Sequence, residues 1–138
     1  MKTLFILAFA CIGLAANAQT NNLTVEVTNF KNANGKLRVA LFTDETNYLK
    51  DSQFASDTIV YSQEKVEVLF ANLPAGEYAI SIYHDENDNG KLDANFMGIP
   101  SEPYAFSNNA PSRFGPAKYA ESKFTLDQEN QIHSIKLN

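Results

Sequence analysis

The densest group of potentially reactive side chains lies in residues 85–93, Asp-Glu-Asn-Asp-Asn-Gly-Lys-Leu-Asp. Oxygen-bearing side chains recur at alternate positions and a glycine follows the third of them, as in the first nine positions of a calcium-binding loop. Alternate spacing directs successive oxygens into one concavity, while glycine lets the backbone double back. The predicted ligands of a calcium ion are Asp85, Asn87, Asn89, the Lys91 carbonyl and Asp93.

This loop departs from the EF-hand pattern at two points. Phe96 stands at the twelfth position, where an EF-hand has a bidentate glutamate, and the loop follows a predicted strand rather than a helix. The prediction is therefore a weak calcium site with a dissociation constant of about 10⁻⁴–10⁻³ M, as in extracellular modules. The alternative is a solvated polar turn, because tight turns also select aspartate, asparagine and glycine.

A second candidate region is the long segment 96–118, which contains four of the five prolines and four aromatic residues. Aromatic faces beside amide groups suit the backbone of a partner protein or a glycan. The predicted partner surface consists of Tyr104, Phe106, Asn108 and Asn109. The alternative is that the aromatic rings cover an open edge of the fold.

Catalytic signals are sparse. The two histidines, His84 and His133, have no spacing typical of a zinc site, and no nucleophile elbow or phosphate-binding glycine loop is present. Carboxylates such as Asp93 and Glu102 are the remaining candidates for acid–base work. We therefore expect no enzyme, with a carboxylate-dependent hydrolase as the alternative.

The elements that must position these residues are strands. Apolar and polar residues alternate along most of the chain, and β-branched and aromatic residues are frequent there. The pair Asn34-Gly35 is a type I′ turn signal, so the strands on its two sides are predicted to form a hairpin. The predicted strands are 23–28, 36–42, 58–61, 65–70, 77–83, 123–126 and 132–137.

About seven short strands predict an all-β fold, a single antiparallel β-sandwich of immunoglobulin-like or transthyretin-like type with one long aromatic and proline-rich loop. Residues 44–57 are the one place where a turn or two of helix is expected, with Tyr48, Leu49 and Phe54 facing inward. The predicted core includes Val25, Val39, Leu41, Val68, Tyr78, Ile80, Ile82 and Phe124.

The first 18 residues have the three parts of a signal peptide: Lys2, an apolar segment, and Ala16-Asn17-Ala18 as cleavage site. Cleavage after Ala18 would leave residues 19–138 as a single domain. A lipidated amino terminus at Cys11 is the alternative, but the preceding residues lack the usual leucine. We expect an exported protein, periplasmic or extracellular, with no membrane span. Its formal net charge of −5 argues against nucleic-acid partners.

Linked motifs carry a family resemblance. They are Leu73-Pro74-x-Gly76-x-Tyr78-Ala79, His84-Asp85-x-Asn87-x-Asn89-Gly90-x-x-Asp93, and Gly98-x-Pro100-x-Glu102-Pro103-Tyr104-x-Phe106-Ser107-Asn108-Asn109. Together they resemble the bacterial family called domain of unknown function 2141. The resemblance implies an exported bacterial protein and supplies no catalytic residues. A glycine is expected after Tyr104, where this chain has Ala105.

These observations favour a secreted or envelope module that binds a partner protein or a glycan and carries a weak calcium-type loop. A carboxylate-dependent hydrolase and a purely structural envelope protein are the alternatives. The hydrolase differs from the other two in one structural feature, because an enzyme needs a pocket that holds a perturbed carboxylate or histidine.

Overall fold

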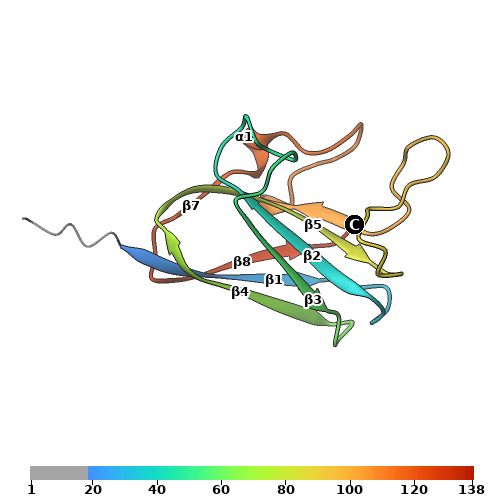
Figure 1. The fold of residues 1–138 in the computed structure, drawn as a ribbon, viewed down its shortest axis with the longest axis horizontal. Coiled ribbons are helices and arrows are strands. Elements are labelled where there is room, and N and C mark those ends of the chain that lie inside the picture. The colour runs from blue at the N-terminus through green and yellow to red at the C-terminus, as the bar shows by residue number, and fades with distance from the viewer. Residues whose placement is uncertain (1–18) are drawn as a thin grey trace, which may run out of the picture.

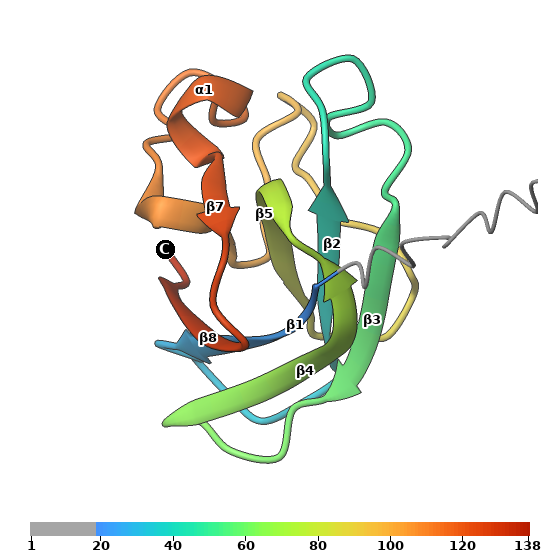
Figure 2. The same ribbon diagram turned by 90° about the vertical axis from the view of Figure 1, so that its left-hand side faces the viewer.

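The computed structural model describes residues 19–138, which form two β-sheets facing each other (Figure 1). The predicted signal peptide, residues 1–18, lies outside the described residues. One sheet has three strands in the order β4-β1-β8, and the other has five, in the order β3-β2-β5-β6 with β7 beside β5. The strands of one sheet run across those of the other (Figure 2). The predicted β-sandwich is confirmed.

The strands are β1 Thr20–Thr28, β2 Lys36–Phe42, β3 Phe54–Ile59, β4 Lys65–Pro74, β5 Gly76–Asp85, β6 Tyr104–Phe106, β7 Phe124–Leu126 and β8 Asn130–Lys136. A 3₁₀ turn, η1 Ser107–Asn109, and one short helix, α1 Tyr119–Ser122, complete the elements. Compared with the prediction, β6 is additional and β3 starts and ends earlier in the chain. Between residues 19 and 138 no helix is long and apolar enough to cross a membrane.

The predicted hairpin around Asn34-Gly35 is wrong. β1 pairs with β4 and, in parallel, with β8, whereas β2 pairs with β3 and β5, so residues 29–35 carry the chain from one sheet to the other. Gly35 does adopt a positive φ of 62°, but a side chain there would meet the Asp85 carbonyl oxygen at 1.9 Å. A glycine is needed here because two backbone segments approach closely. The Asn-Gly sequence pattern does not distinguish this requirement from that of a hairpin turn.

The core lies between the sheets. Alternate residues of each strand point inward, so β1 contributes Leu23, Val25 and Val27, and β5 contributes Tyr78, Ile80 and Ile82. Seven of the eight predicted core residues are buried, and the eighth, Phe124, packs partly buried against the same cluster. Because one cluster joins both sheets, the sandwich is held by a shared apolar interior.

The expected helix in residues 44–57 is absent from the described chain. Residues 45–50 form hydrogen-bonded turns, and Phe54 begins β3. Leu49 is 39% exposed and has a positive φ of 59°, so it does not face inward. Tyr48 does pack inward, with its ring 5.3 Å from that of Phe42 and 5.5 Å from that of Tyr119.

The edge of β5 is covered by the long aromatic segment. β6 pairs Tyr104 with Tyr83 and Phe106 with Ser81, which extends the sheet beyond β5. Ala105 lies in this strand and is buried, so no positive-φ turn occurs where the family resemblance led us to expect glycine. Part of segment 96–118 therefore does cover a sheet edge, as the alternative prediction proposed.

Candidate functional site

The polar loop, residues 85–93, starts at the last residue of β5. The Asp85 side chain is fully buried. Its carboxylate accepts hydrogen bonds from the backbone N–H of Gly90 at 2.8 Å, the N–H of Asn89 at 3.0 Å and the Arg38 Nε at 3.0 Å. Burial favours the protonated acid, but these donors outweigh it and lower the pKa of Asp85 below its usual value. Asp85 is thus an ionised carboxylate whose partners come from the protein itself.

Arg38 of β2 joins this loop to the neighbouring strands. Its guanidinium forms ion pairs with Asp85 at 2.8 Å, with Asp88 at 2.9 Å and with Asp57 of β3. Lys36, two residues earlier on β2, pairs with Asp88 at 3.1 Å. Two cations of β2 therefore neutralise acidic groups of the loop. Arg38 is 47 residues from Asp85 in sequence, and no local pattern revealed the pairing.

The other predicted metal ligands do come together. The side-chain nitrogens of Asn87 and Asn89 donate to the Asp93 carboxylate at 2.7 and 2.9 Å. Their side-chain oxygens accept backbone N–H groups, of Asn89 at 3.2 Å and of Lys91 at 2.9 Å. Because an N–H group only donates, these turns hold the amide oxygens toward the backbone and the amide nitrogens toward Asp93. A cation at this point would need both amides to turn around.

Among residues 19–138, no group of three or more His, Cys, Asp or Glu side chains is arranged to hold a metal ion. This observation does not cover amide and carbonyl oxygens, so calcium binding by the loop stays a prediction. The two ends of the loop are also joined by Glu102, a buried residue outside the loop. One Glu102 oxygen accepts the N–H of Glu86 at 2.9 Å and the other the N–H of Asp93 at 3.0 Å, which ties together the two ends of the loop.

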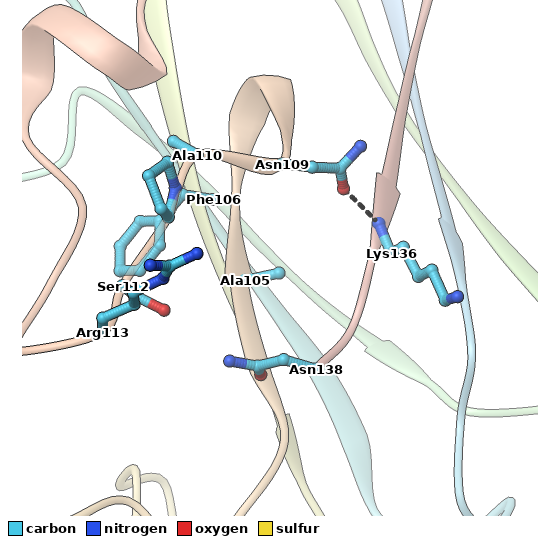
Figure 3. Close-up of a pocket in the computed structure, with 9 residues that line it drawn as sticks. Ala105, Phe106, Asn109, Ala110, Ser112, Arg113, Lys136 and Asn138 are labelled. Carbon is cyan, nitrogen blue, oxygen red and sulfur yellow. Dashed lines mark hydrogen bonds between the residues drawn. The ribbon is translucent and has the colours of Figure 1, made fainter.

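The four residues of the predicted partner surface do not form one exposed face. Phe106 is only 4% exposed, and Tyr104 packs beside it with ring centroids 6.0 Å apart. The Asn108 side chain donates to the carbonyls of Glu121 and Lys123 at 3.0 and 2.9 Å. The Asn109 side-chain oxygen accepts the backbone N–H of Lys136 at 2.8 Å (Figure 3). In this arrangement both asparagines cross-link backbone segments around η1.

Large apolar side chains are exposed in the two segments that precede and follow these residues in sequence. We call them the apolar surface: Leu92, Phe96, Met97, Ile99 and Phe114. Phe96 and Phe114 are fully exposed, and Met97 is 65% exposed. A recess of about 540 Å³ lies here, lined by Leu92, Ile99, Pro100, Tyr104, Phe106 and Phe114, among others. Segments 92–100 and 112–116 thus meet around one apolar hollow, which the sequence did not reveal because neither has a periodic pattern.

Figure 3 shows the residues that line a second recess, of about 340 Å³. Its lining is more polar and includes Asn109, Arg113 and Asn138. Phe106, Ser112 and Arg113 line both recesses, so the two hollows share one boundary. Arg113 is exposed at this boundary.

Neither histidine forms part of a catalytic arrangement. His84 is fully buried, and its Nε2 lies 2.6 Å from the Asn34 carbonyl oxygen, to which it donates. His133 stacks on Phe124 with centroids 4.1 Å apart, and its Nε2 accepts the N–H of Asn108 at 3.1 Å. Burial lowers the pKa of His133. Both rings are held by the fold, away from either recess lining.

The fold and these motifs can be set beside known proteins. No curated protein and no solved structure matches the chain. A family model described as "Uncharacterized protein conserved in bacteria (DUF2141)" matches residues 25–134, which extend from within β1 to within β8 and include the polar loop and the edge strand β6. The match covers most of the chain and includes every motif on which the resemblance was based, so the protein belongs to this bacterial family.

Proposed function

We propose that this protein is an exported module that binds another protein through its apolar surface. The observation that carries the proposal is the full exposure of Phe114 in the lining of an apolar recess. Phe96 is equally exposed and belongs to segment 92–100, of which Leu92, Ile99 and Pro100 line the same recess. Leaving such rings in water is costly, and contiguous exposed apolar groups typically mark an interaction site. Export is inferred from the signal-peptide pattern of residues 1–18.

The composition of the surface supports a protein partner. Segments 94–100 and 110–117 contain one charged residue, Arg113, in a chain with 27 Lys, Arg, Asp and Glu residues. The centres of protein interfaces are likewise poor in Lys, Glu and Asp and rich in aromatic residues, methionine and arginine. Phe96, Met97, Arg113 and Phe114 match this composition.

A glycan is the less favoured ligand. Sugar hydroxyls need several hydrogen-bonding groups, whereas the larger recess is lined mostly by carbon atoms of residues such as Leu92, Ile99 and Pro100. The amides of Asn108 and Asn109, which the sequence predicts to bind a glycan or a partner backbone, form hydrogen bonds with the protein's own backbone. These contacts support apolar recognition over a hydroxyl-rich ligand.

The test is selection of binding peptides. A random peptide library displayed on phage is panned against the full chain recovered in its exported form, and selected peptides are titrated in solution. We expect aromatic or aliphatic peptides whose affinity falls at least about tenfold for Phe96→Ser or Phe114→Ser.

Ile132→Ser is the matched control, because Ile132 on β8 is as exposed as Met97, at 65%, and lies outside the apolar surface. Binding should be unchanged in this variant. Selected peptides that bind the two phenylalanine variants as well as the wild type would contradict the proposal. So would a protein that selects no peptide but binds a glycan array or lipid vesicles.

A further inference from the structure

We infer that the partner segment carries an acidic side chain next to its apolar residues, and that Arg113 binds that carboxylate. This inference rests on the proposed function and specifies the chemistry of the partner. It assigns to Arg113 a role in recognition that neither its sequence context nor the polar loop suggested.

The first support is the contrast between the two arginines of the chain. Arg38 is paired with three aspartates. Arg113, in the described part of the chain, has neither an ion pair nor a side-chain hydrogen bond, although the protein carries a net charge of −5. A guanidinium beside an apolar recess gains most from a carboxylate, which it can bind through two parallel hydrogen bonds.

The second support is a donor that faces the same space. The Asn138 side-chain oxygen accepts the N–H of Tyr104 at 3.1 Å, which fixes the orientation of the amide. Its nitrogen is thereby turned toward the side of the recess where Ser112 and Arg113 lie (Figure 3). A guanidinium and an amide NH₂ are both donors, so each favours an acceptor group in this recess.

Lys136 lines the same recess but is excluded as a second cation. Its side chain extends away from Arg113 (Figure 3). Only its backbone N–H is engaged at the recess, by the Asn109 oxygen at 2.8 Å. Of the two basic side chains in the lining, Arg113 is therefore the one that we assign to the partner's carboxylate.

The shared lining suggests where the partner's acidic residue lies. Since Arg113 lines both recesses, an extended segment that crosses from one to the other passes it. An apolar side chain would occupy the larger recess, the acidic side chain would meet Arg113, and the following residue would enter the smaller recess. An open boundary of this kind suits a side-chain carboxylate within a continuing chain better than a terminal one.

The test uses the peptides selected above, on the full exported chain. We expect an aspartate or glutamate within two residues of an aromatic or aliphatic residue, and amidation of the peptide carboxyl terminus should not matter. Arg113→Gln should weaken binding about tenfold, as loss of a hydrogen bond to a charged group does. Changing the peptide acid to its amide should weaken binding equally, and combining both changes should add little.

Lys136→Gln is the matched control, because it removes a neighbouring cation that faces elsewhere, and binding should be retained. Arg113→Lys should restore part of the affinity. If Arg113→Gln binds normally while Phe114→Ser does not, the inference is overturned and the proposed function stands. Peptides that bind only through a free carboxyl terminus, or binding of free fatty acid alone, also overturn it. A library without binders removes the proposed function and the inference with it.

Discussion

The polar side chains of loop 85–93 and the exposed side chains of the apolar surface differ in whether they have partners within the protein. In the polar loop, the buried Asp85 accepts three hydrogen bonds and forms an ion pair with Arg38, and Asp93 accepts hydrogen bonds from two amides. On the apolar surface, Phe96 and Phe114 are fully exposed. The polar side chains of the loop thus find their partners within the protein, whereas the large apolar side chains of the other region are left in contact with solvent.

Residue type indicates possible chemistry, whereas the partners of each group decide whether that group is available to a ligand. A carboxylate that accepts bonds from Arg38 and two backbone N–H groups stabilises the fold, and its availability for a ligand is reduced accordingly. An exposed ring has no such competing partner. The difference between the two regions predicts how substitutions, calcium and pH change the stability of the protein.

The largest effect is expected for Arg38→Met. This change leaves Asp85 buried and without its cation, so the free energy of unfolding should fall by about 3 kcal/mol. Urea denaturation measures it. Arg113→Met is the control, since it removes the other arginine at an exposed position and should change stability by less than about 0.5 kcal/mol. Equal effects of the two substitutions would abolish the contrast between the regions.

The next largest change in stability is expected when calcium is added. With a dissociation constant near 10⁻³ M, 10 mM calcium would stabilise the protein by about 1.4 kcal/mol, or about 5 °C in melting midpoint. Thermal melts with chelator and with calcium measure the shift, and Asp93→Asn should abolish it. An unchanged wild-type midpoint would mean that the loop is a hydrogen-bonded turn whose amides do not reorient for a cation.

A smaller effect is expected on the pH dependence of stability, through His133, which accepts a hydrogen bond from Asn108 next to the second recess. Burial lowers the pKa of His133, so the unfolded chain takes up the proton at a higher pH than the folded one. Stability should therefore be fully present above pH of about 6.5 and decline as the pH falls below it. Protonation of Nε2 also removes the acceptor for the Asn108 N–H. Melting midpoints at pH 7.5 and 5.5 measure this, and His133→Gln should weaken the pH dependence.

The smallest effect is expected for Phe96→Ser. The ring is fully exposed, so the free energy of unfolding should stay within about 0.5 kcal/mol of the wild type. Phe106→Ala is the contrast, since its ring is buried between the recesses and its loss should be clearly destabilising. A large loss of stability in Phe96→Ser would show that the apolar surface serves the fold.

The strands and core were predictable because alternation directly reports which residues face inward, as with Val25, Val39 and Ile80. Strand pairing was not, because the same alternation fits a hairpin and a sheet-to-sheet crossing such as residues 29–35. The convergence of Asn87, Asn89 and Asp93 followed from local spacing. Contacts between residues distant in sequence could not be predicted, because no local pattern encodes them. They include the ion pair of Arg38 with Asp85 and the packing that buries Phe106 but leaves Phe114 exposed.

The parallel pairing of β1 with β8 has a consequence for folding kinetics. Asn22 and Asn130, which pair at one end of this ladder, are 108 residues apart. Contacts between residues so distant in sequence form late and slow the search for the native state. Until β8 is available, β1 has a partner only in β4, and one of its edges stays open. During synthesis from the amino end, the unpaired backbone groups on this edge of β1 therefore stay exposed until nearly the last residue. The chain is most vulnerable to aggregation in this interval.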